Sequence, residues 1–438
     1  MNFKKILALS FALLFVFLTI IIPLPVSAAE TPHPSFETDG KSACVYDVTH
    51  SQFIYKKNAD EVLNTSTSAK IMMGLIASEQ LADRLNEKIT VTEKMISGVG
   101  GYSMKLKVGE TVTVKDLLYG AICASYNDAA YVLAHVVSDS TGDFVSLMND
   151  RARELGATQT SYTNPLGYPD NSAMVTTLND TLKIATAAYH NELYMKICSA
   201  VSHGVPSTNM SDARFFYNRN YLLSADYQYN YYNKKCSGMN AGISGEAGGW
   251  SIVTVAHDDG ADLICIVLGG TEDENGINAY DTVNKLVNWA CYEYDMHTIF
   301  DVGSDIGTVN VGLTAFGTEK AVYTAAEKVD VYIPTHSHPS ITYRLELTED
   351  ELNAPLNAGD IIGNVSIYCN GQLVATSPVA IKQSYEVNGV MVVIDAIGDY
   401  TKSRAFIITL VAFIILLPTA FIWRSRKTQK RGGYRRRF

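Results

Sequence analysis

The sequence predicts an α+β domain, in which an antiparallel sheet carries a helical subdomain, followed by a small all-β domain and one C-terminal transmembrane helix. Hydrophobic residues alternate as in β-strands near residue 42 and again near residue 250. Between these two regions they recur at three- and four-residue spacing, which is typical of helices. Past about residue 297 the helical spacing stops, and short β-rich runs alternate with Gly, Pro and Asn.

The 438 residues are enough for two domains with targeting segments at the ends. Lys4 and Lys5 precede an unbroken apolar run from Ile6 to Ile22, and Val26-Ser27-Ala28 follows as a cleavage site for a signal peptidase. This pattern predicts a signal peptide over residues 1–29, with an uncleaved anchor helix as the alternative. In either case we expect the chain to be exported.

A transmembrane helix is predicted over residues 403–423. Positions 405–423 carry no charge, and 19 residues of helix are about enough to cross ~30 Å of hydrocarbon. Eight Lys or Arg lie in the last fifteen residues, 424–438, and predict a basic tail that stays in the cytoplasm. We therefore expect a single-pass protein of the cell membrane with its main body outside the cell.

Composition excludes several classes of partner and cofactor. The net charge is −10, but ten of the 35 basic residues lie in the two end segments, so the exported body carries about −20 and has no basic patch for nucleic acid. Seven scattered cysteines without a C-x-x-C pair predict neither a disulfide framework nor a metal site. His336 and His338 alternate like metal ligands but lack a third ligand nearby, which favours a solvated loop. No cofactor is predicted, and the oligomeric state is left open.

The body contains recognisable elements in order. A β-hairpin is predicted from Ser42 to Asn58, and a helix that is apolar almost all round, and therefore buried, starts at Lys70. Paired strands around Trp250 are joined by HDDGAD, whose Asp-Gly is a hairpin turn signal. Further helices are predicted over 114–124, 129–137 and 144–155, and over a segment with Val283, Leu286, Val287 and Ala290 on one face.

Thr67 and Lys70 stand three residues apart at the start of the buried helix, so their hydroxyl and ammonium groups share one helix face. A lysine in so apolar a helix is expected to have a lowered pKa, which would let it act as a base toward the hydroxyl. The alternative is a chance pairing, because many helices contain a hydroxyl residue three positions before a lysine.

Ser125-Tyr126-Asn127 lies between two predicted helices, where it would offer a second hydroxyl and an amide to a cleft. Taken alone, these residues favour a helix N-cap over a catalytic role, because Ser and Asn favour that position.

Together these stretches resemble the serine-type D-alanyl-D-alanine carboxypeptidase family, the low-molecular-weight penicillin-binding proteins, from about residue 40 to 400. The resemblance includes the STSAKIMM helix, SYNDAA, RNYLL, the GEAGGW turn and APLNAGDIIG. It implies a β-lactamase/transpeptidase-like domain over 30–296 and a β-rich C-terminal domain over 297–400. Members of this family attack the terminal amide of peptidoglycan stem peptides with a serine, hydrolyse the acyl-enzyme and react with β-lactams.

The resemblance assigns roles to four residues of the first two family motifs. Lys70 takes the place of the general base in S-x-x-K, but Thr67 stands where the family has its nucleophilic serine. Threonine keeps a hydroxyl, yet its methyl restricts χ1 and crowds the reacting carbonyl. The S-x-N motif is intact, with Ser125 as the proton shuttle and Asn127 as a substrate contact.

The third motif departs further, because K-T-G is replaced by Asn240, Ala241 and Gly242. In the family the lysine and threonine hold the free carboxylate of the terminal D-alanine, so their loss removes contacts worth ~1.5–3 kcal/mol each. Lys234 and Lys235, just upstream, are an alternative source of positive charge. The oxyanion hole maps to the backbone N–H groups of Thr67 and Ile243, which side-chain changes leave in place.

Three functional hypotheses follow from the resemblance. The first is a D-Ala-D-Ala carboxypeptidase acting on peptidoglycan stem peptides, and the second is a catalytically degenerate relative that binds peptidoglycan or serves as a scaffold at the cell surface. The third is a β-lactamase, which the β-rich second domain, the C-terminal anchor and the lack of a convincing deacylating glutamate disfavour. The altered motifs leave the choice between the first two open.

Overall fold

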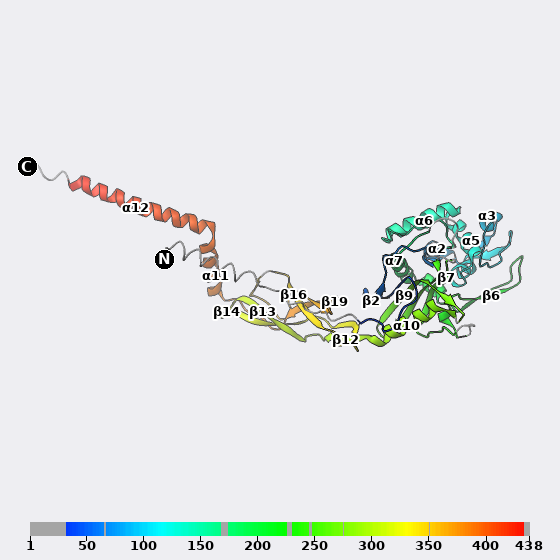
Figure 1. Cartoon of the computed structure of the whole chain (residues 1–438). Helices are drawn as coiled ribbons and strands as arrows, with labels where there is room; N and C mark the ends of the chain where they lie inside the picture. Colours follow the sequence, from blue (N-terminus) through cyan, green and yellow to red (C-terminus); the bar gives the residue numbers. More distant parts are fainter. Residues whose placement is uncertain are drawn as a thin grey trace, which may run out of the picture. The chain divides into compact units, whose positions relative to one another are not determined.

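The computed structural model describes residues 32–432 except 65–66, 168–173, 226–229, 245–247, 275 and 350. The predicted signal peptide and residues 433–438 of the predicted tail lie outside the described residues. The chain divides into two compact units (Figure 1). The first consists of Met1–His297 with Tyr332–Ser340, and the second of Thr298–Val331 with Ile341–Phe438.

The first unit is built on a five-stranded antiparallel sheet with the strand order β2-β1-β9-β8-β7. The predicted hairpin is confirmed as the pair β1–β2, and the predicted strands around Trp250 as the pair β8–β9. Strand β7, which contains the altered third motif, forms one edge of the sheet. The strands are β1 (Ser42–Asp47), β2 (Gln52–Lys57), β7 (Cys236–Ile243), β8 (Trp250–Asp258) and β9 (Ala261–Gly270).

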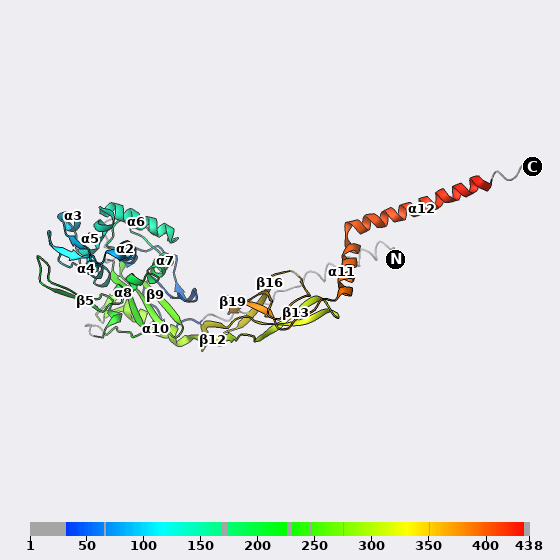
Figure 2. The same cartoon turned by 180° about the vertical axis from the view of Figure 1, so that it is seen from behind.

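Both faces of the sheet are apolar. Successive strand residues point to opposite sides, and in β8 the residues on each side are mostly hydrophobic. Val253 and Val255 join the core that contains α2 (Thr67–Leu81), whereas Ile252 and Ala256 join the core of α10 (Asn278–Glu293). Figures 1 and 2 both show α10 across the sheet from α2. The predicted α+β architecture, with a helical subdomain on a sheet formed by segments from both ends of the unit, is confirmed.

The helical middle surrounds α2, which is buried over most of its length as its composition predicts. The helix predicted over 114–124 is split into α4 (Val114–Leu118) and a π-helical turn, η2 (Tyr119–Cys123). Among the described residues of this unit, the other helices are η1 (Ala82–Arg84), α3 (Glu93–Ile96), α5 (Asn127–Ser138), α6 (Thr141–Glu154), α7 (Leu178–Tyr189), α8 (Glu192–Cys198) and η3 (Tyr221–Leu223). Short pairs join β3 (Lys88–Thr90) to β4 (Thr111–Thr113), β5 (Ser202–Val205) to β6 (Arg214–Tyr217), and β10 (Glu272–Asp273) to β11 (Gly276–Ile277).

The second unit contains a six-stranded sheet with the order β16-β18-β19-β14-β13-β17, and it confirms the predicted small β domain. Its strands are β13 (Asp305–Thr314), β14 (Gly317–Ala325), β16 (Ile341–Leu347), β17 (Leu352–Asn353), β18 (Ile361–Cys369) and β19 (Gln372–Ile381). Strands β12 (Tyr294–Phe300) and β15 (Val329–Pro334) pair separately.

Two helices, α11 (Gly389–Lys402) and α12 (Arg404–Gly432), end the described chain. Within residues 32–432, no single helix passes as long and apolar enough to cross a membrane. Gly389–Lys402 and Arg404–Ala420 pass that test only as a pair, bent by 68° at the break between them.

Candidate active site

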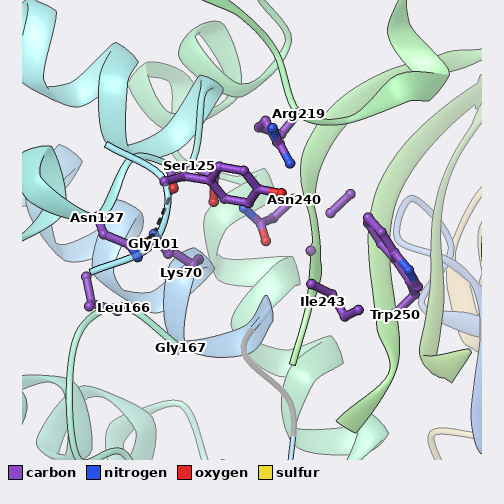
Figure 3. A pocket seen from close by; sticks show the side chains of 13 residues that line it. Lys70, Gly101, Ser125, Asn127, Leu166, Gly167, Arg219, Asn240, Ile243 and Trp250 are labelled. Carbon is purple, nitrogen blue, oxygen red and sulfur yellow. Dashed lines mark hydrogen bonds between the residues drawn. The ribbon is translucent and has the colours of Figure 1, made fainter. Parts of the chain in front are cut away.

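A cavity of about 380 Å³ in the first unit brings together residues from distant parts of the chain. Lys70 comes from α2, Asn127 from the start of α5 with Ser125 just before it, and Gly101 with Tyr102 from the loop between α3 and β4. The opposite wall is the end of β7, with Asn240, Ala241, Gly242 and Ile243. Figure 3 shows these side chains around the cavity. The structure therefore gathers all but one of the residues that the three motifs single out.

Lys70 lies at the base of this site with only 7% of its surface exposed. Its ammonium donates hydrogen bonds to Asn127 Oδ1 at 2.6 Å and to the backbone carbonyl of Ser125 at 3.1 Å. Burial lowers the pKa of Lys70 to about 7, and the nearby Asp128 carboxylate opposes this shift only in part. The expectation of a lysine with a lowered pKa is therefore confirmed. Near neutral pH, part of the Lys70 population is therefore uncharged and can accept a proton.

The Ser125-Tyr126-Asn127 segment turns sharply into α5. Ser125 adopts a left-handed backbone conformation with φ of 57°, and Tyr126 occupies the N-cap position without a side-chain cap bond. Asn127 is already helical, and its Nδ2 donates to the Gly100 carbonyl at 2.7 Å while its Oδ1 accepts from Lys70. Asn127 thus ties the base to the neighbouring loop and does not serve as a helix cap.

Asp128, the next residue of α5, holds that loop in place. Its carboxylate accepts hydrogen bonds from the Ser103 hydroxyl at 2.7 Å and from the backbone N–H groups of Met104 at 2.8 Å and Leu106 at 3.1 Å. A buried carboxylate with this many donors is firmly oriented. The motif residues therefore rest on a rigid support that the sequence did not indicate.

Thr67 is oriented differently from the other motif residues. It is fully buried, and its hydroxyl donates a hydrogen bond to the Ser251 carbonyl of β8 at 3.1 Å. Within the described part of the chain, the residues that line the cavity include Lys70 but not Thr67. The hydroxyl at the nucleophile's position is thus engaged with the sheet.

The β7 wall carries no charged side chain at the third motif. Asn240 and Ala241 are each 5% exposed, whereas Ile243 is 40% exposed at the rim. Lys235, the alternative source of charge, forms an ion pair with Asp258. Neither Lys234 nor Lys235 is among the described residues that line the cavity.

Arg219 also lines the cavity, and sequence reasoning missed it (Figure 3). Its guanidinium lies 3.7 Å from the centre of the Tyr102 ring, a cation–π contact. The backbone is anchored on both sides, because the N–H donates to the Cys123 carbonyl at 3.0 Å and the carbonyl accepts from the Tyr280 hydroxyl at 3.2 Å. The RNYLL stretch was part of the resemblance, but nothing in its spacing indicates that the arginine reaches the motifs.

Metal ligands and disulfides do not contribute to this site in the part of the chain that the structure describes. No group of three His, Cys, Asp or Glu side chains there could hold a metal ion. His336 stacks on Tyr292, with the ring centres 4.2 Å apart. The seven cysteines are free thiols, and burial raises the pKa of Cys44, Cys123 and Cys198 to about 12.

Comparison with known proteins gives matches over both units. Residues 27–272 match the family model for D-alanyl-D-alanine carboxypeptidase, and residues 294–387 match that for the C-terminal domain of penicillin-binding protein 5. Two curated relatives are the D-alanyl-D-alanine carboxypeptidases DacF of Bacillus subtilis and DacC of Escherichia coli. DacF is 26% identical over 84% of this chain and 91% of its own length, and DacC is 28% identical over 85% and 90%.

Solved structures agree with this fold. Penicillin-binding protein 5 from Haemophilus influenzae matches with a TM-score of 0.61 and 21% identity, over 81% of this chain and all of that chain. The D-alanyl-D-alanine carboxypeptidase DacD from Francisella tularensis gives 0.61 and 22%, over 82% and 97%. More than half of the sequence lies within the first family match alone. The chain therefore belongs to the D-alanyl-D-alanine carboxypeptidase family.

Proposed function

We propose that the cavity binds the D-Ala-D-Ala end of peptidoglycan stem peptides and that the protein hydrolyses the terminal amide through an acyl-enzyme. The observation that carries this proposal is the buried Lys70, with a pKa near 7, hydrogen-bonded to Asn127 in an accessible cavity. A base with a pKa near the working pH is what acyl transfer requires. The names of the relatives, D-alanyl-D-alanine carboxypeptidases, support the choice of substrate.

In this mechanism Thr67 is the nucleophile and Lys70 removes its proton. The Thr67 hydroxyl first exchanges its hydrogen bond with Ser251 for one with Lys70 by rotation about χ1. Its oxygen then attacks the carbonyl carbon, and the backbone N–H groups of Thr67 and Ile243 stabilise the oxyanion. Ser125 passes the proton to the leaving D-alanine, and water releases the acyl group with Lys70 again as the base.

Arg219 takes over the recognition of the substrate carboxylate in this proposal. Asn240 and Ala241 provide no charge on the β7 wall, and Gly242 has no side chain. Arg219 is the permanently charged cation among the described residues that line the cavity, since burial lowers the pKa of Lys70 to about 7. A guanidinium can form two parallel hydrogen bonds with a carboxylate.

A second candidate function is binding of the stem peptide without turnover. The placement of Thr67 favours it, because the hydroxyl is fully buried and already satisfied by the Ser251 carbonyl. Breaking this bond inside the protein adds to the cost of attack.

Labelling with a fluorescent penicillin distinguishes the two candidates. The full-length chain in detergent is incubated with the probe, with Thr67→Ala as the matched control. Covalent label on the Thr67 peptide, absent from the variant, is expected for acyl transfer. Protein that is not labelled but still binds a D-Ala-D-Ala peptide would support binding alone. Absence of both labelling and binding would contradict the proposal.

The predicted targeting segments complete the proposal. We place a signal peptide at 1–29, the carboxypeptidase-like domain at 30–296, the β-rich domain at 297–400 as a spacer, a membrane helix at 403–423 and a cytoplasmic tail at 424–438. The charge-free stretch from 405 to 423 and the eight basic residues after it support this topology. The expected result is that full-length protein resists carbonate extraction from membranes, whereas a chain ending at residue 402 is released. Equal extraction of the two would contradict the anchor.

A further inference from the structure

A second group of reactive side chains lies in the first unit, on three adjacent strands of the sheet. Ser237 of β7, His257 of β8 and Asp262 of β9 form a continuous hydrogen-bonded chain. Ser237 Oγ lies 2.7 Å from His257 Nε2, and Asp262 Oδ1 lies 2.6 Å from His257 Nδ1. None of these residues belongs to the three motifs or is among those that line the Lys70 cavity.

The sheet itself brings the three side chains together. His257 and Asp262 are directly opposite each other in the antiparallel register of β8 and β9, so their side chains leave the same face. Cys236 and Ala256, which also pair, contribute to the core of α10. Because strand side chains alternate, His257 and Asp262 point to the other face. Ser237 lies at an irregularity of the β7–β8 pairing between Cys236 and Met239, and its hydroxyl reaches His257 there.

Neighbouring elements hold the group in position. Tyr189 of α7 donates its hydroxyl to the second oxygen of Asp262, and Ser199 donates to the Ser237 carbonyl. Burial, with the hydrogen bond to Asp262, raises the pKa of Tyr189 to about 12, so the phenol stays a donor. The N–H of Asp262 donates to Thr49 Oγ1 at 2.9 Å.

The order of these contacts determines the state of the imidazole. Asp262 accepts the Nδ1–H of His257, and in the neutral imidazole Nε2 then carries the lone pair. That lone pair faces the Ser237 hydroxyl. A serine, a histidine that accepts its proton and a carboxylate that orients the histidine are the components of an activated nucleophile, and they are recognised by geometry and not by position in the sequence.

From this geometry we infer that Ser237 is a second nucleophile, which hydrolyses esters of short acyl groups. Ser237 Oγ attacks the ester carbonyl carbon as its proton moves to His257 Nε2. The bond from the carbonyl carbon to the alkoxy oxygen breaks, and the departing alcohol takes the proton from His257. Water then attacks the acyl-serine by the same route and regenerates the hydroxyl.

The exposure of the group indicates the class of substrate. The side chain of His257 is 52% exposed and that of Asp262 is 29% exposed, and Ser237 is half-buried, so the group lies at the protein surface. An open site accepts a short acyl group on an alcohol of any size but does not surround a long chain. Asp262 acts as a positioning residue, since it contacts His257 and not Ser237 within the group.

A fluorophosphonate probe, which phosphonylates activated serines with loss of fluoride, tests the inference directly. The full-length chain in detergent is labelled in a Thr67→Ala background, which removes the other candidate nucleophile. Tryptic mass spectrometry is expected to locate the phosphonate on Ser237, and the rate is expected to fall at least tenfold in His257→Gln. Ser146→Ala removes an exposed hydroxyl that donates only to its own helix, and it should leave the rate unchanged.

Hydrolysis of p-nitrophenyl butyrate supplies the second measurement. We expect turnover that is lost in Ser237→Ala and that falls at least tenfold in His257→Gln. Circular dichroism verifies that each variant is folded, and His257→Gln, an exposed substitution, keeps the test valid if Ser237→Ala does not fold. Absence of label from Ser237, or an equal labelling rate in His257→Gln, overturns the inference. Because the background lacks the Thr67 hydroxyl, this outcome is independent of the carboxypeptidase proposal.

Discussion

The two walls of the Lys70 cavity differ in what they retain. The helical wall keeps Lys70, Ser125 and Asn127 in one hydrogen-bonded arrangement, whereas the β7 wall presents Asn240 and Ala241 without charge. In the proposed mechanism the helical wall supplies the base, whereas the β7 wall offers no charge to the substrate carboxylate. The difference teaches that the chemical and the recognition parts of one pocket can change separately, because they lie on different elements.

Substitution of Lys70 on the helical wall should have the largest effect on the acylation rate. Lys70→Met removes the base while keeping an apolar chain of similar length, and we expect penicillin labelling to fall by about 100- to 10,000-fold. Stopped-flow measurement of the acylation rate gives the value. Lys94→Met, at an exposed lysine outside the cavity, is the control. If Lys70→Met acylates like the parent, the helical wall does not supply the chemistry.

Restoring the family residues in the first and third motifs should give the next largest effect. Thr67→Ser with Asn240→Lys and Ala241→Thr removes the crowding methyl and restores the carboxylate contacts, so acylation should rise by about 100-fold. The single Thr67→Ser variant separates the contribution of the nucleophile to the acylation rate from that of the β7 wall. A triple variant as slow as the parent would show that further positions have changed.

Arg219→Gln tests carboxylate recognition apart from the chemistry of the helical wall. Loss of a charge-assisted contact of ~1.5–3 kcal/mol predicts that Arg219→Gln raises the KM or Kd of a D-Ala-D-Ala peptide at least tenfold. The matched ligand is the same peptide with an amidated C-terminus, whose binding should not change. An equal loss for both ligands would mean that Arg219 has only a structural role beside Tyr102.

The smallest expected effect concerns stability and pH. The pKa of Lys70 is about 7 in the folded protein and near 10.4 when unfolded, so between these values the unfolded chain binds more protons. The free energy of unfolding therefore rises with pH, by about 1 kcal/mol from this group between pH 7 and 8. Urea titrations of the parent and Lys70→Met at both pH values measure the difference. A constant difference between the two proteins would contradict the low pKa.

Much of this molecule could be predicted from local pattern. The hairpin at Ser42, the all-round apolar helix at Lys70 and the paired strands after Trp250 are confirmed, because hydrophobic periodicity directly reflects which faces are buried. The predicted helix over 114–124 needed correction, since its second half is a π-helical turn. The composition of this segment suits an α-helix as well as a π-helical turn, and packing decides between the two.

The sequence by itself determined the fold class, the family and the identities of Lys70, Ser125 and Asn127, because these depend on residue type and spacing along the chain. Only the tertiary structure decided that the Thr67 hydroxyl bonds to Ser251, that Arg219 reaches the cavity and that Ser237, His257 and Asp262 meet. Each of these relations joins residues on separate elements. The sheet register and the packing of helices on its faces set such distances, and no local pattern encodes them.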